Sequence, residues 1–457
     1  MDPILSLVPA IVAIVLAMST KRIIPSLLVG LFAGSFLLSP GILAPFSKTL
    51  EYMIATLTNS GNLQVILFLY LFSGLVGLIK FSGGVEGFSN SMLRFVKSRK
   101  QFLLSIWGLL PLTFIDCGFR VVSGGAITKD LADKFKLSRA KLAVLLNFTA
   151  SPVISLIPIA TTFVGYMVGL LGIAFTTAGI TGSPYITFLQ SIPFNFFSII
   201  LIIILFATVV TGKGIASGKN IKFEPSKKPE NKDKIWNLVL PIILLIFLSF
   251  FLMYKSGADA GGKGLLDVFS KSNSFNSMLL ALFITLTVSF AFFLFQKFSA
   301  KEMVENIISH GNKIMQTIAI LAVAWPIASV SKDLGLQTLV SSVSNVGIPP
   351  AIIAFLIFAI TSAVAFAIGS SWGTWALMMP VGVSLAAATG SSIPMVAGAV
   401  WAGGTFGDVT SPLSGMTNMA ANVTGTSYNK YFKKALPYAL AAFLLSLVFY
   451  LVFGFIL

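Results

Sequence analysis

The chain has 457 residues, of which 56% are hydrophobic and only 10% are charged. So few charged side chains cannot cover a water-soluble globule of this size, which excludes the soluble classes and predicts an all-α polytopic membrane protein. The net charge of +16 would suit a nucleic-acid ligand, but the basic residues lie in short loops between apolar segments, where the positive-inside rule accounts for them. We expect a multi-pass protein of the cytoplasmic membrane, with the lipid bilayer as its partner and no nucleic acid.

Apolar segments that could cross a bilayer recur along the whole chain. Lys21 and Arg22 follow the first of them, which places that turn in the cytoplasm and the N-terminus outside. Together, the apolar segments of the chain predict about ten full spans plus two re-entrant hairpins. The clearest segments are residues 4–18, 65–79, 194–210, 235–254, 278–295 and 435–457.

Residues 101–127 lie between two basic loops. The preceding loop contains Arg94, Lys97, Arg99 and Lys100, and the following loop contains five further basic residues between 129 and 141. A single crossing cannot join two cytoplasmic loops. We therefore predict a re-entrant helical hairpin whose tip lies at residues 116–125.

A broken helix is predicted at residues 142–171, because the polar residues and Pro152 within 147–152 interrupt an apolar segment. After the next span, residues 213–234 carry seven lysines against three acids. This basic cytoplasmic linker separates a first half, residues 1–212, from a second half, residues 235–457.

The second half repeats the order of the first. Residues 350–380 predict a hairpin interrupted at 369–374, and residues 393–418 predict a helix broken by the polar stretch 406–418. The charged loops indicate that the first span of the first half begins outside the cell, whereas the first span of the second half begins in the cytoplasm. This pattern predicts an inverted repeat, in which two discontinuous helices form a transport site near the membrane midplane.

The polar residues at the two hairpin tips and two breaks are the candidate ligands for an ion or a substrate. Their carboxylate, amide, hydroxyl and freed carbonyl oxygens suit Na+, while free helix N-termini suit an anionic group. We expect no cofactor besides Na+ and H+ as coupling ions. The candidates are Asp116, Asn147, Thr149, Ser151, Ser370, Ser371, Thr374, Asp408, Thr410, Ser411 and Asn418.

Asp408 and Asp116 are the sharpest candidates for Na+, because an acid inside a membrane is costly and usually functional. Asp408 could instead cap the helix break. Arg120 follows Asp116 at i+4, so the two could form a structural pair, or Arg120 could clamp a substrate carboxylate. The single histidine, His310, is interpreted as a solvated loop residue.

The chain contains no phosphate-binding loop, metalloprotease motif or nucleophilic triad, so we do not expect an enzyme.

Two groups of residues form sequence signatures. The first is residues 116–152, including Thr149-Ala150-Ser151-Pro152. The second is Ser371-Trp372-Gly373-Thr374-Trp375-Ala376 together with Phe406-Gly407-Asp408 and Ser411-Pro412. Both resemble signatures of the NhaC-type Na+/H+ antiporters. The resemblance implies the wider ion-transporter superfamily, with scaffold and transport domains, opposed hairpins, commonly a homodimer, and elevator-like movement.

The chain departs from this family at several titratable positions. The family typically has paired acids where this chain has Ile115-Asp116, and aspartates where Asn147 and Gly415 stand, while Arg120 replaces a small residue. Our leading hypothesis is a cation-coupled secondary transporter, with Na+/H+ antiport implied by the resemblance. The alternative is a Na+- or H+-coupled carrier of a small carboxylate or amino acid, and an ion channel is a third hypothesis.

Overall fold

The structure is a computed structural model that describes residues 3–87, 96, 98–108, 110–113, 116–159, 161–217, 234–336, 338 and 349–456, and this part of the chain is all α-helical. Six of its helices are long and apolar enough to cross a membrane: α4 (Ser60–Phe81), α14 (Trp236–Asp259), α16 (Ser274–Phe295), α18 (Met315–Asp333), α20 (Pro350–Ile368) and α24 (Tyr428–Ile456). The multi-pass membrane class is confirmed.

Further helices complete the apolar set. The pair α12 (Pro184–Ser191) and α13 (Phe196–Thr211) is bent by 45° and passes the same test when taken together. Three shorter apolar helices are α1 (Val8–Thr20), α2 (Ile23–Leu38) and α11 (Thr162–Ala178).

The remaining helices include the short pieces that build the site. Their bounds are α3 (Ala44–Leu57), α6 (Arg99–Gly108), α7 (Leu110–Thr113), α8 (Cys117–Lys134), α9 (Arg139–Phe148), α10 (Ser151–Ile154), α15 (Leu265–Lys271), α17 (Ala300–Lys313), α21 (Ser371–Thr389), α22 (Ile393–Thr410) and α23 (Gly415–Thr424). Single-turn 3-10 helices lie at Pro3–Leu7, Ile192–Phe194 and Gly214–Ala216.

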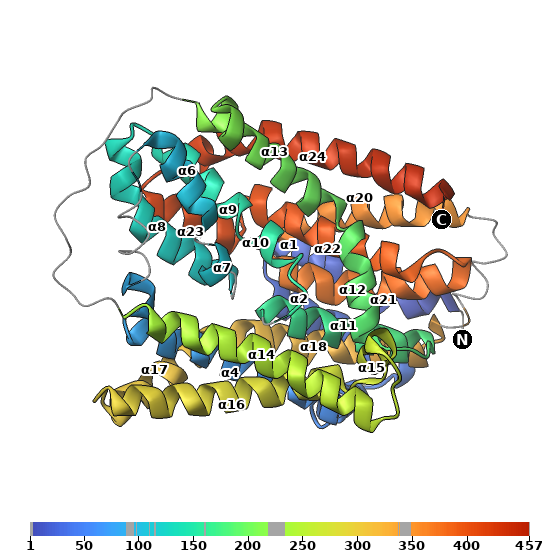
Figure 1. Cartoon of the computed structure of the whole chain (residues 1–457). Helices are drawn as coiled ribbons and strands as arrows, with labels where there is room; N and C mark the ends of the chain where they lie inside the picture. The colour runs from blue at the N-terminus through green and yellow to red at the C-terminus, as the bar shows by residue number, and fades with distance from the viewer. Residues whose placement is uncertain are drawn as a thin grey trace.

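Helix α22 lies at the centre of the molecule, where it packs against α20, α21, α12, α13 and α24 (Figure 1). Glycines allow this close packing. A Cβ atom added at Gly404 would lie 2.0 Å from Nε1 of Trp375, and one added at Gly407 would lie 2.5 Å from the Cβ atom of Ala365. Small residues at helix interfaces let backbones approach in a membrane, where dispersion replaces the hydrophobic driving force.

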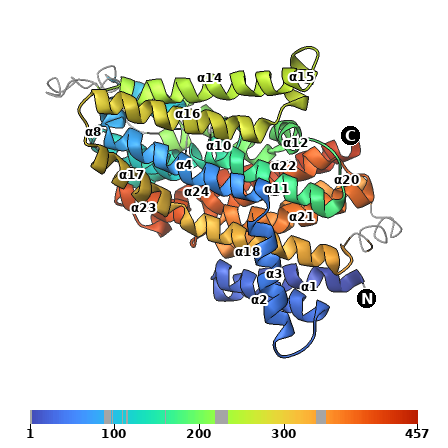
Figure 2. The ribbon, with the colours of Figure 1, turned by 90° about the horizontal axis from the view of Figure 1, so that it is seen from below.

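Two groups of helices flank this centre. Helices α4, α14, α16 and α17 pack together on one side, while α1, α2 and α3 gather around α18 (Figure 2). Helix α11 connects the centre to both groups, because it contacts α21, α4 and α18. It therefore lies between the site at the centre and the outer helices.

The structure divides each segment predicted as a hairpin or a broken helix into two or three helical pieces. The segment 101–127 is divided among α6, α7 and α8, and the segment 142–171 among α9, α10 and α11. The segment 350–380 corresponds to α20 and α21, which extends to Thr389. The segment 393–418 corresponds to α22 and α23, which are separated by residues 411–414 and end at Thr424.

The start of the basic linker is bound to the helices around the first hairpin. Arg99, which is buried, donates to the carbonyl oxygens of Phe135 and Ser217 at 2.6 and 2.8 Å. Lys141 donates to the carbonyl oxygen of Ser217 at 3.0 Å. The rest of the predicted linker, residues 218–233, lies outside the described residues, as do Arg94 and Lys97.

The interpretation of His310 as a solvated loop residue is wrong. His310 lies in the last turn of α17 and is half-buried against α4, where a Cβ atom added at Gly77 would lie 2.5 Å from its ring. Ser73 of α4 donates to its carbonyl oxygen at 2.6 Å. The polar residues around it occupy the exposed face of an amphipathic helix, which a search for polar segments does not distinguish from a loop.

Candidate functional site

The candidate site lies where two interruptions of the helical backbone meet. Helix α9 ends at Phe148, and α10 begins at Ser151 with Pro152 as its next residue. Helix α22 ends at Thr410, and residues 411–414, which include Pro412, separate it from α23. Proline cannot donate the backbone hydrogen bond that a continuous helix requires, so both breaks follow from the sequence.

Asp408 lies in the last turn of α22 and is only 3% exposed. Its carboxylate accepts hydrogen bonds from the hydroxyl of Ser371 at 2.8 Å and from the backbone N–H of Ser371 at 3.3 Å. Ser371 is the first residue of α21, so Asp408 lies against a helix N-terminus, where the helix dipole favours negative charge. Asp408 thus caps a helix of the second hairpin and keeps unused acceptor capacity.

Asn147 connects the two breaks directly. Its amide nitrogen donates to the carbonyl oxygen of Asp408 at 3.3 Å and to the hydroxyl of Tyr431 at 2.8 Å. Tyr431 in turn donates to the carbonyl oxygen of Val409 at 2.7 Å. Residues from both halves of the chain therefore share one hydrogen-bond network around Asp408.

Two buried oxygen atoms beside this network have no hydrogen-bond partner among the described residues. They are Oδ1 of Asn147 and the hydroxyl of Ser151, and both residues are fully buried. The Ser151 hydroxyl lies near Asp408 and Cys117. A buried acceptor without a partner costs about 1–3 kcal/mol, so such atoms usually mark a bound ion, water or ligand.

Asp116 and Arg120 do not form an ion pair in the described structure. Asp116 caps α8, because its Oδ1 atom accepts from the backbone N–H of Phe119 at 2.8 Å, and its Oδ2 atom accepts from Thr162 at 3.4 Å. Arg120 is fully buried and donates to the carbonyl oxygen of Ile106 at 2.5 Å and the hydroxyl of Thr149 at 3.0 Å. The sequence left two alternatives for Arg120, a structural pair with Asp116 or a clamp for a substrate carboxylate. The structure does not contain the pair with Asp116.

The guanidinium of Arg120 has no described carboxylate partner, and its Nε atom has no partner among the described residues. Through Ile106 and Thr149 it ties α6 to the end of α9, next to the first break. A buried cation without a counter-ion is unfavourable, so an anionic ligand would stabilise it.

The other predicted residues form hydrogen bonds with backbone groups, most of them nearby in the chain. Ser370 caps α21 by accepting from the N–H of Gly373 at 3.3 Å. The hydroxyls of Thr374, Thr410 and Ser411 donate to the carbonyl oxygens of Ser370, Phe406 and Phe366. Asn418 donates to the carbonyl oxygens of Pro412 and Ser414 at 2.9 Å each. Thr410, Ser411 and Asn418 shape the second break, whereas Ser370 and Thr374 shape the start of α21.

Three residues near the site were not among the sequence-based candidates. Ser414 caps α23 and donates to the carbonyl oxygen of Asp408 at 3.0 Å. Tyr431 and the buried Cys117 lie beside Asn147 and Asp116 respectively. Ser414 could have been found, because a serine just after Pro412 and before an apolar helix is a typical N-cap, whereas nothing in the sequence marks Tyr431.

The interrupted helices, the buried acid and the apolar helices around them define a membrane transporter. The chain belongs to the Na+/H+ antiporter family, whose family model matches residues 153–455. The resemblance seen in the sequence is thereby confirmed.

Individual relatives extend this result. An uncharacterized protein of Haemophilus influenzae is 30% identical over 471 residues, which cover 98% of this chain and 91% of that protein. An uncharacterized Na+/H+ antiporter of the same organism is 34% identical over 95 residues, 21% of this chain and 20% of the relative. The malate-2H+/Na+-lactate antiporter of Bacillus subtilis is 30% identical over 108 residues, 24% of this chain and 23% of the relative.

Solved structures show the same fold at low sequence identity. The YdaH transporter of Alcanivorax borkumensis superimposes with a TM-score of 0.66 at 15% identity, covering 96% of this chain and 98% of the other. MtrF of Neisseria gonorrhoeae, reported with a class of antimetabolite efflux pumps, gives a TM-score of 0.58 at 15% identity and covers 90% and 85%. These structures are evidence of a shared transporter fold.

Proposed function

We propose that the protein is a secondary transporter of the cytoplasmic membrane in which Na+ binds at Asp408, and that it exchanges Na+ for protons. The buried Asp408 carboxylate carries this proposal, because the hydroxyl of Ser151 lies beside it and the side chain of Asn147, whose Oδ1 atom has no partner among the described residues, contacts the backbone of Asp408. Carboxylate, amide and hydroxyl oxygens are ligands that a hard cation prefers. A proton could replace Na+ on the same carboxylate, which is the basis of exchange.

Alternating access is proposed to depend on an inverted repeat. The first break, at residues 149–150, is followed by Ser151-Pro152, and the second, at residues 411–414, begins with Ser411-Pro412. Each break comes after one of the two predicted hairpins in the chain. The positive-inside rule gives the two halves opposite orientations. We further propose that two copies assemble as a homodimer, as the family resemblance implies.

Proteoliposomes would test the assignment of Asp408. Asp408→Asn keeps the size of the side chain but removes the charge, so we expect Na+ affinity to fall about 10- to 100-fold, as for the loss of one charge-assisted contact. Na+-driven changes in luminal pH report antiport, and Asp259→Asn, which changes an exposed acid at the end of α14, is the matched control. If Asp408→Asn leaves the Na+ dependence unchanged, the carboxylate does not bind the coupling ion.

A second candidate function is the cation-coupled transport of a small carboxylate or amino acid. It is supported by the buried Arg120, which has no described carboxylate partner, and by similarity over 108 residues to a malate-2H+/Na+-lactate antiporter. A guanidinium binds carboxylates in two-point geometry.

Uptake of radiolabelled malate and lactate would test this function. We expect Arg120→Lys to reduce uptake of the transported acid about tenfold or more, because the lysine keeps the charge but loses the two-point contact. Arg22→Gln, at an exposed position, is the control. Thermal unfolding of each variant separates lost binding from lost folding. Na+-dependent pH changes with no acid uptake would reject this candidate and leave antiport.

A further inference from the structure

A large cavity lies apart from Asp408, at the end of the molecule that the charge distribution places outside the cell. Its volume is about 680 Å³, which is the size that small organic ligands occupy rather than a bare ion. Residues of α3, α4, α11 and α18 line it, together with residues 183–185 and 272–275. The nearby loop 176–193 has no charged residue, as expected on the external side.

The cavity is separated from the candidate ion site along α11. Thr162, the first residue of α11, contacts Asp116, whereas Val168 and the later residues of this helix line the cavity. Between these levels, Phe163 packs edge-on against Trp372 and Trp375 of α21, with ring centroids 5.2 and 5.0 Å apart. Aromatic side chains thus lie between the two sites.

One face of α18 supplies the charged groups of the cavity. Trp325, Ser329, Lys332 and Asp333 all line it, and their spacing of i, i+4, i+7 and i+8 places them on one side of the helix. Trp325 is 2% exposed, and its indole N–H has no hydrogen-bond partner among the described residues. A buried donor of this kind is costly unless a ligand or water accepts from it.

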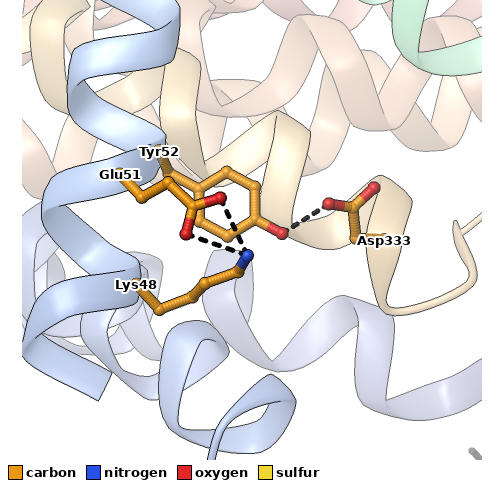
Figure 3. A network of polar contacts seen from close by, with 4 residues as sticks. All are labelled: Lys48, Glu51, Tyr52 and Asp333. Carbon is orange, nitrogen blue, oxygen red and sulfur yellow. Dashed lines mark hydrogen bonds and ion pairs between the residues drawn. The ribbon is translucent and has the colours of Figure 1, made fainter. Parts of the chain in front are cut away.

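The two charged residues are consecutive in α18, are both exposed, and contact different neighbouring helices. Lys332 donates to the carbonyl oxygen of Thr176 at 3.3 Å and has no ion-pair partner among the described residues. Asp333 accepts a hydrogen bond from the phenol of Tyr52 on α3, next to the ion pair of Lys48 and Glu51 (Figure 3).

The phenol of Tyr52 remains a donor over the physiological pH range. Burial, and then the contact with Asp333, raises the pKa of Tyr52 well above its usual value, so the side chain stays protonated. A carboxylate has about four acceptor positions. Asp333 therefore keeps the capacity to accept from a second donor.

Beyond the two charged residues, the cavity has apolar walls formed by Val65, Val168, Ile173 and Phe275. One ammonium group without an ion-pair partner among the described residues, one carboxylate, and walls of apolar and uncharged polar side chains together match a net-neutral solute that carries both charges at one end.

We propose that this cavity is an external binding site for a small zwitterion of the α-amino-acid type. The ligand carboxylate binds Lys332, the ligand ammonium group binds Asp333, and the ligand side chain enters the apolar part, where an oxygen atom can accept from Trp325. The ligand would bridge α11 and α18, since Lys332 already contacts Thr176 across that boundary.

Calorimetric titration of the full-length protein in lipid nanodiscs with the proteinogenic L-amino acids tests this site. We expect at least one to bind, and its deaminated acid and decarboxylated amine to bind about tenfold or more weakly, because each lacks one charged contact. Lys332→Met and Asp333→Asn should have effects of similar size, while Trp325→Phe should weaken only ligands with a side-chain oxygen. Lys263→Met, in an exposed external loop, should change nothing.

The side of binding is tested with Asn273→Cys, a position that lines the cavity. A membrane-impermeant maleimide should label it from outside, and the bound amino acid should slow the labelling; the native Cys117 is buried and does not interfere. Equal binding of the deaminated acid, unchanged affinity in both charge variants, or no binding at all would overturn the proposal. Asp408→Asn should weaken Na+ binding without changing the affinity for the amino acid, so the two proposals fail separately.

Discussion

At the level of single residues, the site has less negative charge than its family implies. Asp408 is the buried acid of the network, while an amide stands at Asn147 and a glycine at Gly415, where the resemblance implies aspartates. One carboxylate balances one Na+, but a second would hold the cation more tightly and compete for protons. The charge count at these positions therefore sets how strongly protons and Na+ compete.

Gly415→Asp would restore one of these acids without a steric penalty. A Cβ atom added at Gly415 meets no atom within 4 Å, and the position is the first residue of α23, where an acid is favoured by the helix dipole. We expect the free energy of unfolding to change by no more than about 0.5 kcal/mol and Na+ affinity to increase.

Isothermal titration with NaCl and chemical denaturation would measure both effects. Gly415→Asn is the matched control, because it has nearly the same size and no charge. A strongly destabilised Gly415→Asp variant, or an increase in affinity shared by Gly415→Asn, would contradict the electrostatic argument.

At the level of helices, the sequence predicts the breaks well because proline acts locally. Pro152 and Pro412 remove a backbone donor wherever the helix goes, so the interruptions beside Ser151 and Ser411 could be located without a structure. The contacts between the breaks could not, because Asn147 reaches Asp408 across 261 positions of the chain. Such pairing depends on helix packing, which one sequence does not encode in any local pattern.

The sequence does not predict the buried face of the amphipathic helix α17. The segment around His310 reads as polar, yet α17 buries one face against α4, and the ring of His310 lies against Gly77. The pKa of His310 is lowered by burial and then by the positive charge of Lys313, with a further contribution from Lys80 of α4. Protonation of His310 therefore opposes the packing of α17.

This predicts a stability loss on the acid side. Because the folded-state pKa lies below the unfolded value of about 6.5, the folded protein binds fewer protons, and stability falls as the pH drops through and below 6.5. The wild type should therefore lose apparent melting temperature through this group between pH 8 and pH 5.5. His310→Gln should remove that loss while leaving the slope from other groups. Parallel melting profiles for the two proteins would show that His310 contributes nothing.

At the level of the whole molecule, the proposed opposite orientation of the two halves would give the meeting of the breaks a function in transport. Helices interrupted near mid-length can place free helix ends toward one site from both sides of the membrane. In the structure, the end of α9 and the end of α22 meet at Asn147 and Asp408. Packing of this kind could arise in either orientation of the halves, so the direction of each half in the membrane is the decisive observation.

Cysteine accessibility at equivalent helix ends tests this orientation. α1 and α14 are the first apolar helices of the two predicted halves, and inversion requires their C-terminal ends to lie on opposite sides of the membrane. Ser19→Cys lies at the end of α1 and Ala260→Cys just after α14, and both positions are exposed. An impermeant maleimide applied to intact cells should label Ala260→Cys at once and Ser19→Cys only after permeabilisation, with the buried Cys117 of the parent protein as the unlabelled control. Labelling of both positions from the same side would rule out the inverted repeat and, with it, a site built from two oppositely oriented halves.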